Sequence, residues 1–88
     1  MATLEMNFQT AAKSILTLTN RPDDATLLTL YALYKQATEG DLQGSRPGIF
    51  DLKRRKKYDA WRSLSGTARE TAMTKYIELA NQLLADGR

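Results

Sequence analysis

Apolar residues recur every three or four positions through most of the chain, a spacing typical of amphipathic α-helices. The last third shows it most clearly, at Ala72, Met73, Tyr76, Ile77, Ala80, Leu83 and Leu84. Nowhere does the strict alternation of a half-buried strand compete with it. Because 88 residues can bury only one small core, the chain is predicted to form a single all-α domain over residues 1–88.

Prolines and glycines divide this periodic sequence into four predicted helices. They cover about residues 7–18, 23–40, 51–66 and 67–84. The first ends before Pro22, because a proline disfavours a helical residue in front of it. Asp23 and Asp24 can cap the second helix, and Gly40 supplies its stop. The predicted architecture is a four-helix bundle.

Residues 41–50 are predicted to form a loop, because small turn-forming residues dominate them. The apolar end of this loop, Ile49–Phe50, is expected to anchor it to the body of the domain. The fourth helix is expected to open with a capping box, in which the Thr67 side chain caps the first turn and Glu70 reaches back.

Cysteine and histidine are both absent, and this excludes several classes of function. Without cysteine there is no disulfide scaffold, no thiolate nucleophile and no thiolate zinc site. Without histidine the chain lacks the commonest general base and metal ligand, and no carboxylate pair lies in an evident catalytic arrangement. We therefore expect a binding protein rather than an enzyme, with no metal and no cofactor.

A net charge of +3 favours an anionic partner, such as nucleic acid, anionic lipid or a phosphorylated small molecule. The N-terminal sequence has neither the basic nor the apolar region of a secretory signal. The most apolar run, residues 27–34, is far shorter than the ~20 residues that span a bilayer. We therefore expect a soluble cytoplasmic protein.

The predicted second helix carries Tyr31, Tyr34 and Lys35 at positions i, i+3 and i+4, which share one face. Leu28 extends the same strip, whereas Leu27 can supply the core stripe. On spacing alone, tyrosines of this kind are more often core residues, and a neighbouring lysine is more often solvated. A second apolar strip with polar tips nevertheless needs a partner, either another helix or a ligand.

Five consecutive basic residues, Lys53 to Lys57, open the predicted third helix. Lys53 and Lys57 lie one turn apart and face the same way. Such a run is either a solvated face or a site for nucleic acid, anionic lipid or a phosphorylated ligand. Arg46, in the preceding loop, is a weaker indication of a phosphate contact, and a structural turn is the preferred interpretation of residues 46–48.

Several motifs follow one another in a specific order. They are Tyr31-x-x-Tyr34-Lys35-Gln36-Ala37-Thr38-x-Gly40-Asp41, Arg46-Pro47-Gly48, Lys57-Tyr58-Asp59-Ala60-Trp61, Gly66-Thr67, Ala72-Met73 and Tyr76-Ile77. In this order the chain resembles the acyl-CoA-binding protein family, from about Phe8 to Leu84. The resemblance implies a four-helix bundle of that type, which binds long-chain fatty acyl-CoA thioesters non-covalently.

The resemblance also implies which residues contact the ligand. They are Ala12, Arg21, Leu27, Leu28, Tyr31, Tyr34, Lys35, Lys57 and Tyr76. Acyl-CoA carries phosphates, an adenine and a long tail, so cations, aromatic faces and aliphatic side chains are the groups that it needs. The implied role is a monomeric intracellular acyl-CoA carrier and buffer in lipid metabolism, in transient contact with membranes or with acyl-CoA-using enzymes and without a nucleic-acid partner.

A few positions depart from the family pattern. Leu16 stands where a basic residue is common and could instead extend the apolar floor, and Tyr58 replaces a common tryptophan. Arg54 and Arg55 make the basic run denser than usual. These departures leave tail-length preference and affinity open. The alternative hypothesis is a small basic helical module that binds nucleic acid through Lys53 to Lys57, although no recognised DNA-binding motif supports it.

Overall fold

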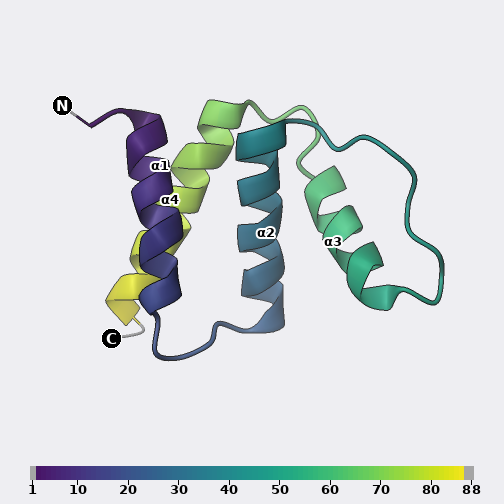
Figure 1. Cartoon of the computed structure of the whole chain (residues 1–88), viewed down its shortest axis with the longest axis horizontal. Coiled ribbons are helices and arrows are strands. Elements are labelled where there is room, and N and C mark those ends of the chain that lie inside the picture. The colour runs from purple at the N-terminus through teal and green to yellow at the C-terminus, as the bar shows by residue number, and fades with distance from the viewer. Residues whose placement is uncertain (1, 87–88) are drawn as a thin grey trace.

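A computed structural model describes residues 2–86, and within that range it contains helices and no strand (Figure 1). The helices are α1 (Leu4–Ser14), α2 (Asp24–Glu39), α3 (Leu52–Arg62) and α4 (Arg69–Asp86), and a 3₁₀ turn, η1 (Ile15–Thr17), extends α1. The predicted all-α class and the division into four helices are confirmed. None of the helices described is long and apolar enough to cross a bilayer.

The helices form a flat bundle with extents of 42 × 28 × 15 Å. α4 packs against both α1 and α2, and α3 packs against the other side of α2. α1 and α4 run in one direction, whereas α2 and α3 run in the other (Figure 1). Among the helices described, α3 packs against α2 alone, so the outer side of α3 and the long loop that leads into it are left at the periphery.

The hydrophobic core lies between α1, α2 and α4. Its buried members are Phe8, Ala11, Leu30, Leu33, Ala37, Ala72, Tyr76 and Ala80. α4 contributes Ala72, Tyr76 and Ala80, which lie four residues apart on one face, and the alanines allow the neighbouring helices to approach closely. Phe8 is fully buried at the centre of this core.

Local capping explains where three of the helices begin. Thr3, Asp23 and Asp51 each accept a hydrogen bond from the backbone N–H three residues on, at 3.1, 2.7 and 3.3 Å. The first helix begins at Leu4, earlier than expected, because Thr3 provides this cap. Gly40 ends α2 with φ at 79°, which a glycine adopts without strain.

The expected capping box at the start of α4 is wrong. α4 begins at Arg69, so Thr67 lies in the turn before the helix. The Thr67 carbonyl oxygen accepts a hydrogen bond from Nε2 of Gln36 at 2.8 Å. Within the part of the chain described, no hydrogen bond links the side chains or backbone of Thr67 and Glu70. This hydrogen bond to α2 keeps Thr67 out of the capping position that the sequence predicted for it.

The expected anchor of the 41–50 loop is also wrong. Ile49 is 64% exposed and Phe50 is 96% exposed, so neither packs against the body of the domain. The loop is attached instead by a two-pronged ion pair, in which Arg46 donates to both carboxylate oxygens of Asp59 at 3.0 and 2.7 Å. The Tyr58 hydroxyl also donates to a loop carbonyl at 3.0 Å. These polar contacts hold the loop along α3 without using its apolar end.

Candidate functional site

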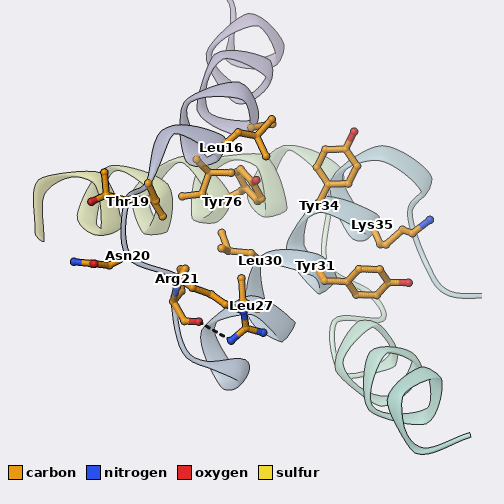
Figure 2. A pocket seen from close by; sticks show the side chains of 14 residues that line it. Leu16, Thr19, Asn20, Arg21, Leu27, Leu30, Tyr31, Tyr34, Lys35 and Tyr76 are labelled. Carbon is orange, nitrogen blue, oxygen red and sulfur yellow. Dashed lines mark hydrogen bonds between the residues drawn. The ribbon is translucent and has the colours of Figure 1, made fainter. Parts of the chain in front are cut away.

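Two cavities adjoin along the N-terminal half of α2. The first has a volume of about 750 Å³ and lies between η1, α2 and α4 (Figure 2). The second has a volume of about 550 Å³ and lies between the start of α2 and the start of α3. Arg21, Leu27 and Tyr31 line both cavities, so these side chains form the boundary at which the two meet.

Each residue that the sequence nominated for ligand contact lines one of these cavities or both. The first cavity is lined by Ala12, Arg21, Leu27, Tyr31, Tyr34, Lys35 and Tyr76. The second is lined by Arg21, Leu27, Leu28, Tyr31 and Lys57. The structure therefore brings the nominated residues together, but in two cavities: Lys35 lines the first, Lys57 lines the second, and Tyr31 lines both.

Aromatic side chains form one wall of the first cavity. The ring of Tyr76, which is 5% exposed, lies 6.1 Å from that of Tyr34, centroid to centroid. Phe8 lies against both rings, at 5.1 Å from Tyr76 and 5.5 Å from Tyr34. Burial, together with the neighbouring Tyr34, raises the pKa of the Tyr76 phenol above 10.0. Tyr76 therefore stays a neutral hydrogen-bond donor across the physiological range.

The first cavity also has an apolar lining that sequence reasoning did not assign to the site. Ile15, Leu18 and Leu30 line it beside the nominated residues. The change from α-helix to 3₁₀ turn at Ile15 carries the chain along the cavity. Leu16 lies on the rim and is 83% exposed, opposite Arg21 and Leu27 in Figure 2. This geometry favours the expectation, stated from the sequence, that Leu16 extends the apolar floor of the site.

Positive charge converges on the ring of Tyr31. The ammonium nitrogen of Lys57 lies 5.2 Å from the ring centroid, and that of Lys35 lies 6.0 Å from it. The same nitrogen of Lys35 donates to Oε2 of Glu39 at 2.6 Å, and this hydrogen bond raises the pKa of Lys35. Two cations supplied by different helices therefore lie near one aromatic ring, an arrangement that suits a flat group carrying phosphates.

Arg21 can add a third cation to the boundary between the cavities. Its guanidinium donates to Oδ1 of Asp24 at 2.9 Å, in a pair whose side chains are 69% and 86% exposed. Exposed pairs of this kind contribute little to stability. The guanidinium can therefore leave Asp24 for a phosphate at small cost.

Several residues of the motifs named above do not line the cavities but connect the helices around them. Gln36 is fully buried, and its Nε2 donates to Oδ1 of Asp41 at 2.8 Å as well as to the turn before α4. The same Asp41 oxygen accepts the backbone N–H of Gly66 at 2.8 Å. Trp61 of α3 donates its indole N–H to the carbonyl of Gly40 at 2.9 Å. This network, which we call the Gln36 hub, ties α3 and α4 to the C-terminal end of α2.

Comparison with known proteins agrees with this geometry. The family model described as "Acyl CoA binding protein" matches residues 5–80. An acyl-CoA-binding protein of Saccharomyces cerevisiae is 47% identical over 78 residues, which are 89% of this chain and 90% of that protein. One from Brassica napus is 44% identical over 81 residues, which are 92% of this chain and 88% of that protein.

Solved structures give the same result. The crystal structure of Oryza sativa Acyl-CoA-Binding Protein 2 matches with a TM-score of 0.91 and 43% identity, over 94% of this chain and 90% of that one. The solution structure of the yeast protein matches with a TM-score of 0.73 and 46% identity, over 91% and 93% of the two chains. The resemblance seen in the sequence motifs is confirmed, and the chain belongs to the acyl-CoA-binding protein family.

Proposed function

We propose that this protein binds long-chain acyl-CoA thioesters non-covalently and acts as an intracellular carrier and buffer of them. In this proposal residues 1–88 form a single binding domain that works as a cytoplasmic monomer and meets membranes and acyl-CoA-using enzymes transiently. Membership of the acyl-CoA-binding protein family supports the ligand class. The observation that supports this site for the ligand is the boundary at Tyr31, where two cations lie near an aromatic ring beside an apolar cavity.

The polar half of acyl-CoA suits this boundary. Its phosphates would be met by Lys35, Lys57 and Arg21, and each charge-assisted hydrogen bond contributes about 1.5–3 kcal/mol. Its adenine would stack on the ring of Tyr31. Tyr76, a phenol whose pKa is raised by burial, would donate a hydrogen bond to an oxygen of the ligand. The cations of the site thus match the phosphates of acyl-CoA, the ring of Tyr31 matches its adenine, and the hydroxyl of Tyr76 matches one of its oxygens.

The tail of acyl-CoA suits the apolar part of the first cavity. Ile15, Leu27 and Leu30 offer aliphatic surface there, and the exposed Leu16 can cover a tail from above. Burial of each methylene contributes about 0.8 kcal/mol, or roughly a fourfold gain in affinity. Affinity should therefore rise with tail length for as long as the added methylenes remain buried.

A binding role accounts for the titratable groups of the site better than a catalytic one. The pKa values of Lys35 and Tyr76 are both raised, so neither group is poised to accept a proton near neutral pH. The nucleic-acid alternative receives no support from the family model or from the relatives described above. Lys57, one of its five cations, is only partly exposed, and its ammonium nitrogen lies 5.2 Å from the centroid of the Tyr31 ring.

Calorimetric titrations test the proposal. Palmitoyl-CoA is expected to bind one-to-one, octanoyl-CoA more weakly, and free CoA about a hundredfold or more less tightly than palmitoyl-CoA. A Lys35→Gln/Lys57→Gln variant should lose about a hundredfold in affinity for palmitoyl-CoA. Lys13→Gln/Lys75→Gln is the matched control, because it removes the same charge outside both cavities.

Two results would contradict the proposal. Equal affinity for free CoA and palmitoyl-CoA would show that the apolar cavity takes no tail. Unchanged binding by the Lys35→Gln/Lys57→Gln variant would remove the boundary at Tyr31 from the site. Binding of a short DNA duplex in place of acyl-CoA would favour the nucleic-acid hypothesis instead.

A further inference from the structure

Three large apolar side chains lie exposed where the long loop enters α3, two on the last turn of the loop and one at the first residue of the helix. Ile49, Phe50 and Leu52 are 64%, 96% and 66% exposed. The turn is closed by a hydrogen bond from the backbone N–H of Asp51 to the carbonyl of Gly48 at 3.0 Å. It lies where the long loop enters α3, at the edge of the bundle away from α1 and α4 (Figure 1). Such a cluster on a small protein usually marks an interaction surface.

The loop is already fixed by polar contacts, so these apolar residues are not needed to hold it in place. Arg46 forms two hydrogen bonds to Asp59, and Tyr58 donates to the carbonyl of Gly44. Both ties lie on the chain before or after the turn and leave Ile49 and Phe50 projecting outward. Ile49 and Phe50 are therefore exposed in a loop that other residues hold in place.

Exposed cations follow the turn. Lys53, Arg54 and Lys56 are exposed and follow it directly on α3. The carboxylates around these cations are engaged: Asp51 caps α3 and lies 3.6 Å from Arg54, and Asp59 is paired with Arg46. Asp24, which lines the second cavity with Lys53 and Lys56, is paired with Arg21. Within residues 2–86, Lys53 and Lys56 form no ion pair. The turn thus presents an apolar tip with a rim of positive charge that is largely uncompensated.

We propose that the 49–56 surface (Ile49, Phe50, Leu52, Lys53, Arg54 and Lys56) docks on the surface of an anionic lipid bilayer. The apolar tip would enter the headgroup region while the cations contact acidic headgroups. A bilayer fits better than nucleic acid, because a phosphate backbone would satisfy the cations but leave Phe50 in water. Exposed apolar side chains beside unpaired cations also complement the apolar interior and the acidic headgroups of such a bilayer.

Docking through this surface would also place the second cavity of the candidate site near the bilayer. Leu52, Lys53 and Lys56 also line the second cavity, beside Leu28. Docking would therefore bring the mouth of that cavity to the bilayer surface, where an amphiphilic ligand resides. This consequence rests on the proposed acyl-CoA binding, whereas docking itself needs no ligand and is measured separately.

Vesicle binding of the full chain tests the inference. The protein is expected to co-sediment with phosphatidylcholine vesicles that contain about 30% phosphatidylserine and to bind pure phosphatidylcholine at least tenfold less. Ile49→Ser/Phe50→Ser should weaken binding about tenfold or more, and Lys53→Gln and Arg54→Gln about fivefold each. Met6→Ser, on α1 and 57% exposed, is the matched apolar control and should bind like the wild type.

A fluorescent label reports insertion directly. Because the chain has no cysteine, Phe50→Cys provides a unique site for an environment-sensitive dye, and Met6→Cys provides its control. The dye at position 50 is expected to shift to the blue with anionic vesicles, and the dye at position 6 is not.

The outcomes separate this inference from the proposed function. Absence of binding to anionic vesicles, or equal binding by wild type and Ile49→Ser/Phe50→Ser, would overturn the docking surface. Stronger binding to a DNA duplex than to vesicles, with the same dependence on Phe50, would also overturn it. Vesicle binding that persists in a protein without affinity for palmitoyl-CoA would leave the docking surface standing and remove the proposed ligand.

Discussion

Replacing the buried Gln36 with leucine is expected to destabilise the fold by about 1–3 kcal/mol, because it removes the centre of the Gln36 hub. Nε2 of Gln36 donates to Oδ1 of Asp41 and to the carbonyl of Thr67, both at 2.8 Å. Gln36 lines neither cavity, so the change leaves the residues of the candidate site in place. Leucine is close to glutamine in size, so little of the effect comes from lost packing.

The magnitude follows from what each group loses. The Thr67 carbonyl is left without this donor in a partly buried place, which costs about 1–3 kcal/mol. Asp41 loses less, because the backbone N–H of Gly66 still donates to it at 2.8 Å. An opposing effect comes from Oε1 of Gln36, which is buried without a hydrogen-bond partner among the described residues. Leucine removes that oxygen and recovers on the order of 1 kcal/mol.

Urea unfolding measures this difference. Trp61 is the only tryptophan and donates to the carbonyl of Gly40 beside the hub, so its fluorescence follows the affected region. Gln82→Leu, on the exposed face of α4, is the matched control and should change stability by less than about 0.5 kcal/mol. A Gln36→Leu protein as stable as the wild type would refute the reasoning, since the unpaired oxygen would then outweigh both hydrogen bonds.

Three further expectations concern the core and the response to pH. Phe8→Ala should cost about 3–5 kcal/mol in urea unfolding, because Phe8 is fully buried between two tyrosine rings; a loss below 1 kcal/mol would contradict its central place. The hydrogen bond from Arg46 lowers the pKa of Asp59 below 3.8, so this contribution to stability is present above that pH and is lost as pH falls through the folded-state pKa. Asp59→Asn should therefore be less stable at pH 7 and lose less stability on acidification, as measured by circular dichroism; a slope equal to that of the wild type would count against the pair. Burial raises the pKa of Tyr76, so stability should decline as pH rises above 10.0, where the unfolded phenol ionises first. Tyr76→Phe should remove the last tyrosine step from an alkaline absorbance titration, and persistence of that step would show that another phenol is the buried one.

Helix positions were predictable because their determinants are local. Asp23 caps α2 through a backbone N–H only three residues away, and Gly40 ends the same helix through its own backbone conformation. Lys35 beside Tyr31 follows from one helical turn. Such interactions depend on neighbours within about four residues, so a pattern in the sequence contains them. Spacing alone nevertheless preferred a core role for the tyrosines, and the prediction of a ligand site came from the order of motifs that resembles a family.

The tertiary structure decided the features that join distant segments. Lys57 reaches the ring of Tyr31 only because α3 packs against α2. Gln36 reaches Thr67 across 31 residues, and that contact replaces the local cap that the sequence favoured. Arg46 finds Asp59 across 13 residues, and the loop then needs no apolar anchor. Phe50 therefore faces solvent, although it is one of the most apolar side chains in its segment. The attachment of a loop depends on which distant residues it contacts, and a local sequence pattern does not contain that information.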